Sequence, residues 1–220
     1  LVEGLKNLLT DLENSPTGQL KPSMIDHDAF EVGKNIATTE GSVVYECEMF
    51  QLIQYTPKTE KVAKRPLLIF PPWINKFYIL DLQPKNSFIK FSVEEAEQTT
   101  FVVSWKNPDE SFRNVSWEGY MEAMLDATNK VLDITGEKDL NAIGYCIAGT
   151  LLTSTLAYMK NKGCTKINSA TYFTSLSDFS EAGELKLFLE EDTINSIEEK
   201  MAETGYLKGE DMASIFSSLR

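Results

Sequence analysis

The sequence predicts an α/β fold in which a parallel sheet carries helices on both faces. Three observations support this prediction. The run Leu67–Phe70 is apolar at every position, as expected of a strand that is covered on both sides. Strand-like and helix-like segments then alternate at the spacing of βα units. The composition, 42% hydrophobic and 25% charged, is that of an ordinary globular protein, which excludes general disorder.

The first 60 residues have the character of an appendage. Residues 1–12 have the spacing of a short helix, turn residues follow it, and a β-prone stretch covers residues 43–53. A charged break at 57–65 separates this region from the strongest strand. We therefore expect residues 1–60 to form an N-terminal segment outside the sheet.

The core of the sheet is predicted to occupy residues 61–176. Its clearest helix begins at Trp117, with Ser116 as the N-cap and Gly136 as the stop. The methionines and aromatic residues along this helix are interpreted as core packing. The other elements predicted in this region are, in order, strand 67–70, helix 87–96, strand 100–105, strand 140–145, helix 147–159 and strand 167–173.

The character of the chain changes after residue 176. Residues 177–204 are strongly acidic, have helical spacing and contain no β-branched run. We interpret residues 177–220 as the start of a helical cap. Because the chain begins at Leu1 rather than Met and stops at Arg220 within an amphipathic segment, we expect it to be part of a longer protein.

Charge and composition exclude several function classes. A formal charge of −12, from 33 acidic and 21 basic residues, argues against nucleic acid as a partner. The apolar stretch 66–75 has about half the length of a membrane-spanning helix. We expect no signal peptide, because no pair of charged n-region and apolar h-region opens the chain. Three cysteines without CxxC spacing and one histidine indicate neither a disulfide framework nor a zinc site. We expect no metal and a reducing, cytoplasmic setting.

The candidate for covalent chemistry is Cys146. It lies between a predicted strand and a predicted helix, in the strand–turn–helix context of a nucleophile elbow. Gly144 and Ala148 supply the small neighbours that such a sharp turn requires. The turn also places the sulfur at a helix N-terminus, where partial positive charge favours a thiolate over a thiol. The alternative of a dinucleotide-binding loop fails, because it would need glycine in place of Cys146.

The loop after strand 67–70 is the candidate source of a backbone N–H that would bind an oxyanion. Acyl transfer at an elbow takes one oxyanion donor from the residue after the nucleophile and another from the loop after an earlier strand. Pro71 and Pro72 have no N–H, so the first amide available in that loop belongs to Trp73. We expect the backbone N–H groups of Ile147 and Trp73 to form the donor pair.

The remaining candidates are assigned structural roles. Cys47 and Cys164 have no special context and are interpreted as structural cysteines. His27 precedes every strand, whereas a histidine base follows the nucleophile at such elbows, so we interpret it as a surface residue. Asp178 follows a strand and could serve as the acid of a triad, but a cap or structural role is favoured.

Several distinctive motifs follow one another along the chain: Ala29–Asn35, Gln51–Tyr55, Pro66–Lys76, Tyr78–Pro84, Val103–Trp105, Asn107-Pro108, Gly144–Ile147 and Asp178–Ser180. In this order they resemble the motifs of polyhydroxyalkanoate synthases, and their forms look more like the class I, short-chain enzymes. The resemblance implies an α/β-hydrolase fold, incomplete here, with an N-terminal helical appendage and the start of a cap. Cys146 matches the family's nucleophile, and the family's aspartate and histidine would lie beyond Arg220. Ala148 departs from the family's usual glycine.

The same resemblance implies an activity. It would be an acyltransferase that polymerises (R)-3-hydroxyacyl-CoA, chiefly 3-hydroxybutyryl-CoA, into a polyester through an acyl-cysteine, releasing CoA and using no cofactor. Implied partners are the acyl-CoA, the growing polyester, a second copy of the chain and granule-associated proteins, in the cytoplasm at polyester granules. Lys76 and Lys85 are candidates for contact with anionic CoA. The alternatives are a thioesterase or polyester depolymerase, and a non-catalytic protein for granule attachment or oligomerisation. Without the downstream residues we expect this chain to be inactive alone.

Overall fold

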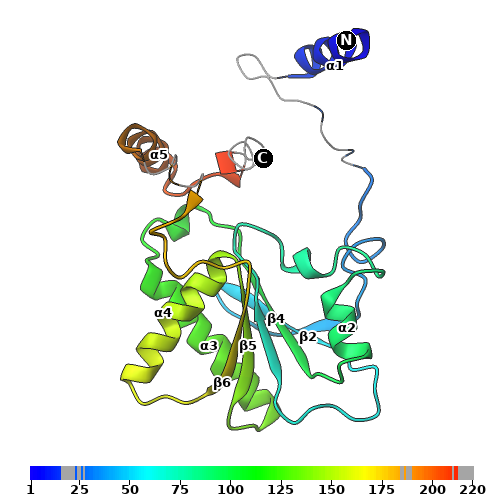
Figure 1. Ribbon diagram of the computed structural model, residues 1–220, viewed down its shortest axis with the longest axis vertical. Helices are drawn as coiled ribbons and strands as arrows, with labels where there is room; N and C mark the ends of the chain where they lie inside the picture. Colours follow the sequence, from blue (N-terminus) through cyan, green and yellow to red (C-terminus); the bar gives the residue numbers. More distant parts are fainter. Residues whose placement is uncertain are drawn as a thin grey trace.

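The computed structural model describes residues 1–15, 23, 26, 28–183, 186, 190–209 and 211–212. Its centre is a six-stranded sheet with the order β1-β2-β4-β3-β5-β6 (Figure 1). The strands are β1 (Gly41–Glu46), β2 (Phe50–Tyr55), β3 (Leu67–Phe70), β4 (Thr100–Trp105), β5 (Leu140–Tyr145) and β6 (Ile167–Phe173). The α-helices are α1 (Val2–Asn14), α2 (Phe88–Glu94), α3 (Trp117–Thr135), α4 (Ile147–Asn161) and α5 (Glu191–Thr204).

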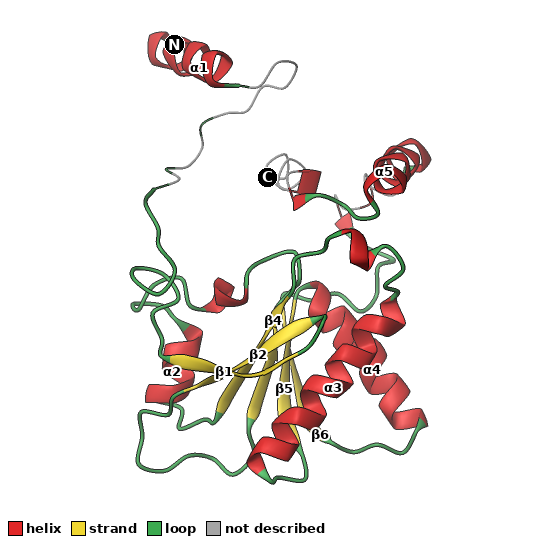
Figure 2. Cartoon of the chain, turned by 180° about the vertical axis from the view of Figure 1, so that it is seen from behind, coloured by secondary structure: helices red, strands yellow, loops and turns green. Residues whose placement is uncertain are grey.

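The α/β prediction is confirmed by the pairing of the strands. β3 lies between β4 and β5 and is parallel to both, and β6 is parallel to β5. Helices α3 and α4 pack side by side on one face, whereas α2 covers the other (Figure 2). Strands β3, β4 and β5 therefore form a parallel core with side chains buried on both faces, as the apolar run in β3 predicts, whereas the edge strand β6 has no buried residue.

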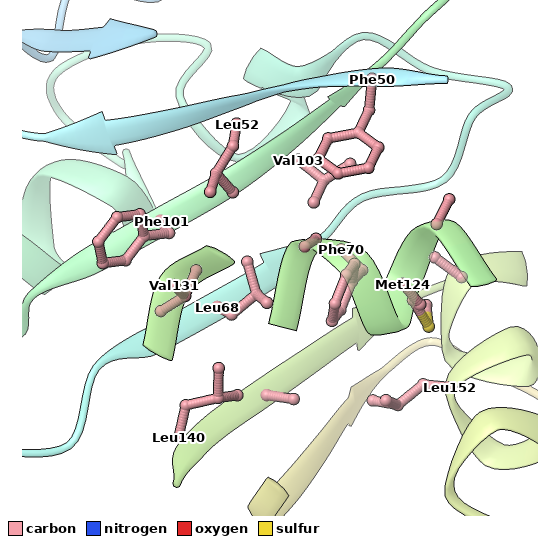
Figure 3. Packing of buried hydrophobic residues seen from close by; sticks show 14 of the residues in the cluster. Phe50, Leu52, Leu68, Phe70, Phe101, Val103, Met124, Val131, Leu140 and Leu152 are labelled. Carbon is pink, nitrogen blue, oxygen red and sulfur yellow. The ribbon is translucent and has the colours of Figure 1, made fainter. Parts of the chain in front are cut away.

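Side chains of β3 alternate between two hydrophobic clusters. Leu68 and Phe70 point toward α3 and α4, where they meet Met124 and Leu152 among other buried residues (Figure 3). Ile69 points the opposite way and joins the cluster under α2. All three β3 side chains are fully buried. This alternation follows from the two-residue period of a strand. The buried Phe70 side chain fixes the end of β3 in the sheet, and so fixes the point where the next loop begins.

The sheet begins earlier than the sequence indicated. β1 and β2 form an antiparallel hairpin, and β2 pairs antiparallel with β4, for example Leu52 opposite Val103. The prediction that residues 1–60 lie outside the sheet is therefore wrong for this hairpin. The physical reason is burial, since four of the six side chains of β2 are buried on the two faces of the sheet. The charged break at 57–65 is a connection between strands of one sheet.

The segment before β1 is fixed to the core by a buried carboxylate. Asp81 is 1% exposed and follows a 3-10 turn at Phe77–Leu80. Its Oδ1 accepts hydrogen bonds from the hydroxyls of Ser87 (2.5 Å) and Thr39 (2.8 Å), and its Oδ2 accepts one from the Thr39 amide (3.1 Å). The Ala37 amide donates to the Asp81 carbonyl at 2.9 Å. A buried carboxylate is tolerated here because both oxygens have donors.

The two ends of the chain differ in how far they are packed. No residue of α1 is buried, and in Figure 1 this helix lies apart from the sheet. The predicted helical character after residue 177 is realised in α5, whose Ala202 carbonyl accepts a hydrogen bond from the Arg113 guanidinium (3.1 Å). The division of the chain at residues 60 and 176 into separate domains stays a prediction.

Candidate functional site

Cys146 occupies the turn between β5 and α4. Its backbone has φ 55° and ψ −127°, a conformation that residues with a Cβ rarely adopt. Such strain persists only when neighbouring structure enforces it, and it is concentrated at functional sites. The thiol stands at the first turn of α4, on the edge of the sheet where the parallel strands end. The sheet, its helices and this elbow together confirm the predicted α/β-hydrolase class.

The tightness of the elbow explains its small residues. A Cβ on Gly144 would lie 2.6 Å from Gly149 Cα, and a Cβ on Gly149 would lie 2.6 Å from Ser175 Cβ. Ala148 is completely buried, so a methyl group fits at this position. The sequence singled out Gly144 and Ala148, but it gave Gly149 no role of its own. Position 149 requires glycine because Ser175, which is 26 positions away in the sequence, occupies the space that a Cβ would need.

The residues after β6 contact the elbow directly. The Cys146 amide donates to the Phe173 carbonyl (2.9 Å), and the Ser175 hydroxyl donates to the Cys146 carbonyl (2.9 Å). The Thr150 hydroxyl donates to the Leu176 carbonyl (2.6 Å). We call residues 173–176 the strap. The chain turns sharply within the strap, because Thr174 has φ 43°.

The predicted oxyanion loop lies beside the elbow. Because Phe70 at the end of β3 is paired with Gly144 at the end of β5, the chain leaves both strands at the same level. The Trp105 indole Nε1 donates to the carbonyl of buried Pro71 at 2.7 Å, which orients the loop from the neighbouring strand β4. The amide of Ile147 is the first of α4 and has no acceptor within the helix. The pair Ile147 and Trp73 stays a prediction.

Aromatic rings hold the Trp73 side chain. Its ring centroid lies 4.6 Å from that of Tyr120, 6.0 Å from that of Trp117 and 6.1 Å from that of Trp105. Burial raises the pKa of Tyr120, so its phenol stays protonated at neutral pH. The aromatic residues at the start of α3 pack against the main hydrophobic cluster, as predicted, and they also flank this loop.

The other residues considered in the sequence have local partners, lie in other connections of the chain or fall outside the described residues. Asp178 accepts a hydrogen bond from the Ser180 amide (2.9 Å), which lowers the pKa of its carboxyl and makes it a turn residue. Cys47 lies between β1 and β2, and Cys164 lies after α4. His27 lies outside the described residues.

Two lysines were predicted to contact an anionic substrate. Lys76 Nζ donates to Asn107 Oδ1 (3.0 Å), which links the oxyanion loop to the loop after β4. Lys85 is exposed. In the described ranges no three His, Cys, Asp or Glu side chains converge to hold a metal ion. None of the helices that the structure describes is long and apolar enough to span a bilayer.

Comparison with known proteins identifies relatives for the whole chain. The family described as "Poly-beta-hydroxybutyrate polymerase (PhaC) N-terminus" matches residues 1–92. The chain is 49% identical to "Poly(3-hydroxyalkanoate) polymerase" of Methylorubrum extorquens, across 100% of this chain and 36% of that protein. It is 42% identical to the "Poly(3-hydroxyalkanoate) polymerase subunit PhaC" of Cupriavidus necator, across 99% of this chain and 37% of the relative. The chain therefore spans about a third of the length of these curated relatives.

The solved structures that resemble this chain have low sequence identity to it. A fungal esterase from Rhizomucor miehei gives a TM-score of 0.49 at 14% identity, with 75% of this chain and 52% of that chain covered. The "HSL-homolog EstE7 from a metagenome library" gives a TM-score of 0.48 at 12% identity, with 66% and 47% covered.

Proposed function

We propose that the chain is part of a poly(3-hydroxyalkanoate) polymerase, like the relatives that it matches, and that it carries the cysteine nucleophile of a polyester-forming acyltransferase. The substrate would be an (R)-3-hydroxyacyl-CoA, chiefly 3-hydroxybutyryl-CoA, and the products a polyhydroxyalkanoate and free CoA. The observation that carries this proposal is the strained backbone of Cys146 at the N-terminus of α4. The proposal needs no cofactor, because the CoA thioester is already activated for acyl transfer.

The elbow suits the chemistry of thioester exchange. The Cys146 thiolate attacks the carbonyl carbon of the CoA thioester, and the carbonyl oxygen becomes an oxyanion. The backbone N–H groups of Ile147 and Trp73 receive that oxyanion. When the tetrahedral intermediate collapses, the bond to the CoA sulfur breaks, CoA leaves as a thiolate that takes a proton from water, and the acyl group stays on Cys146. Exchange between two sulfurs has little energetic cost, since the leaving groups are alike.

Chain growth is the second half of the reaction. The hydroxyl of a growing polyester, or of another monomer, attacks the acyl-Cys146 carbonyl and expels the cysteine sulfur. This step needs a base that removes the hydroxyl proton. The resemblance places the family's aspartate and histidine beyond Arg220, so we propose that this chain does not polymerise by itself.

A chimera tests this proposal. The chain would replace the corresponding region of the Methylorubrum extorquens relative, to which it is 49% identical, and the product would be incubated with 3-hydroxybutyryl-CoA. We expect insoluble polyester and free CoA, and neither from the matched Cys146→Ser chimera. Release of 3-hydroxybutyric acid without polymer would instead support the thioesterase or depolymerase alternative.

The non-catalytic alternative rests on α1. Leu5, Leu8, Leu9 and Leu12 are all more than 40% exposed and share one face of this helix. This apolar face would serve attachment to a granule or to another chain, whether or not the protein is catalytic. Dimerisation, granule-associated partners and a cytoplasmic location at granules remain part of the proposal, with the family as their support.

A further inference from the structure

The strap contacts the elbow at the carbonyl of the nucleophile itself. The Ser175 hydroxyl is half-buried and donates to the Cys146 carbonyl at 2.9 Å. That carbonyl also accepts from the Gly149 amide (2.9 Å) and from the Thr150 amide (3.4 Å) at the start of α4. The hydroxyl therefore adds a donor from outside the helix to a carbonyl that the helix already engages.

The Cys146 carbonyl and the Ile147 amide belong to one peptide unit. A trans peptide is planar, so the C=O and the N–H point in opposite directions and turn together. A hydrogen bond that fixes the carbonyl on one side consequently fixes the direction of the N–H on the other. Donation to the carbonyl also polarises the peptide and makes its N–H a stronger donor.

Three local features place Ser175 beside the Cys146 carbonyl. Gly149 lacks the Cβ that would lie 2.6 Å from Ser175 Cβ, so the glycine leaves the space that the serine fills. Thr174, with φ 43°, turns the strap back toward the elbow, and Thr150 fastens the strap at Leu176. These features converge on a single contact, the hydroxyl to the Cys146 carbonyl.

We propose that Ser175 is a positioning residue for acyl transfer: its hydroxyl aligns and polarises the Cys146–Ile147 peptide so that the Ile147 N–H receives the oxyanion. This inference rests on the proposed function, in which Cys146 is the nucleophile. Ser175 does not touch the acyl group. It acts through the peptide, and its effect is confined to reactions in which an oxyanion forms.

Two probes separate this role from a general structural one. The ester p-nitrophenyl acetate acylates a thiolate through an oxyanion, whereas iodoacetamide alkylates it by displacement and forms none. Mass spectrometry of the Cys146 peptide gives both rates in the same chain, and Cys47 and Cys164 serve as internal references. The variants are Ser175→Ala, Ser175→Thr, which keeps a hydroxyl, and Ser169→Ala, whose hydroxyl bonds Asn141 near the other end of β6.

We expect Ser175→Ala to slow acylation of Cys146 by about tenfold, as a weakened oxyanion donor predicts, while alkylation changes less than about twofold. Ser175→Thr should restore acylation, and Ser169→Ala should leave both rates unchanged. Equal slowing of the two reactions, or no slowing, would overturn the inference. If Cys146 of the parent chain reacts no faster than Cys47 and Cys164, the proposed function fails instead.

A measurement that needs no reactivity keeps the inference testable in that case. The amide proton resonance of Ile147 reports the polarisation of its peptide. We expect Ser175→Ala to shift this resonance upfield, with Ser175→Thr and Ser169→Ala close to the parent. An unchanged Ile147 resonance in Ser175→Ala would refute the alignment whatever the role of Cys146.

Discussion

The hydrogen bond from Trp105 to Pro71 gives a prediction that can be worked out quantitatively. The Trp105 Nε1 lies 2.7 Å from the carbonyl oxygen of Pro71, which is buried at the exit of β3. Trp105→Phe replaces the indole with a smaller aromatic ring beside Phe50 and Trp73. The substitution therefore removes the N–H donor and part of the ring area. A buried carbonyl that loses its partner costs about 1–3 kcal/mol. The variant should be destabilised by this amount plus the loss of packing from a smaller ring.

Trp117→Phe is the matched control for the packing contribution. Trp117 also contacts the Trp73 ring, at 6.0 Å, and is likewise half-buried. Within the described structure its indole N–H donates no hydrogen bond, so the same substitution there changes ring size alone. The difference between the two variants isolates the bond to Pro71.

Urea unfolding followed by circular dichroism measures both free energies of unfolding. We expect Trp105→Phe to lose about 1–2 kcal/mol more than Trp117→Phe, since half-exposed surroundings let water replace part of the bond. Equal losses, within about 0.5 kcal/mol, would show that the indole N–H does not hold the loop. That result would refute the orientation of the oxyanion loop by Trp105 of β4.

Three further predictions concern other parts of the core and surface. Gly144→Ala should cost at least about 1–3 kcal/mol in thermal unfolding, because its Cβ would lie 2.6 Å from helix backbone, whereas Gly4→Ala in open space should be neutral or stabilising; equal effects would contradict the tight elbow. Asp81→Asn should cost about 1–3 kcal/mol in urea unfolding, because the oxygen of asparagine can keep both hydroxyl donors but its NH₂ cannot accept from the Thr39 amide; a loss below about 0.5 kcal/mol would contradict the buried network. Hydrogen bonds from Ser111 and Lys106 lower the pKa of Asp109 to about 2, so their contribution to stability is present above the ordinary carboxyl pKa and is lost as pH falls toward 2. In NMR titrations Ser111→Ala should raise this pKa, and an unchanged midpoint would exclude the hydroxyl as its cause.

The local part of the fold was predictable because the signals are local. The strands at 100–105, 140–145 and 167–173 have the bounds that the sequence predicted, and the helix with Ser116 as its N-cap ends at Gly136 with φ 71°. Capping residues and side-chain periodicity act within a few positions of the chain. The elbow at Cys146 belongs to this class, since its small neighbours and flanking elements are contiguous.

The long-range part was not predictable from the same signals. β2 pairs with β4, about fifty residues further along the chain, and nothing in the sequence of β2 specifies that partner. Ser175 is one of many serines, and only the folded chain brings its hydroxyl to the Cys146 carbonyl. Asp81 is similar, because a lone aspartate in a loop is ordinarily exposed and its burial depends on Thr39 and Ser87.

Acylation of Cys146 by the proposed substrate would show whether this cysteine is the nucleophile. The chain would be incubated with 3-hydroxybutyryl-CoA at mildly alkaline pH, quenched in acid, digested and analysed by mass spectrometry, with Cys146→Ser as the control. We expect one 3-hydroxybutyryl group on the Cys146 peptide, formed well before any adduct on Cys47 or Cys164 and absent from the serine variant. Acylation of the three cysteines at equal rates, or at the rates of the urea-unfolded chain, would contradict this expectation.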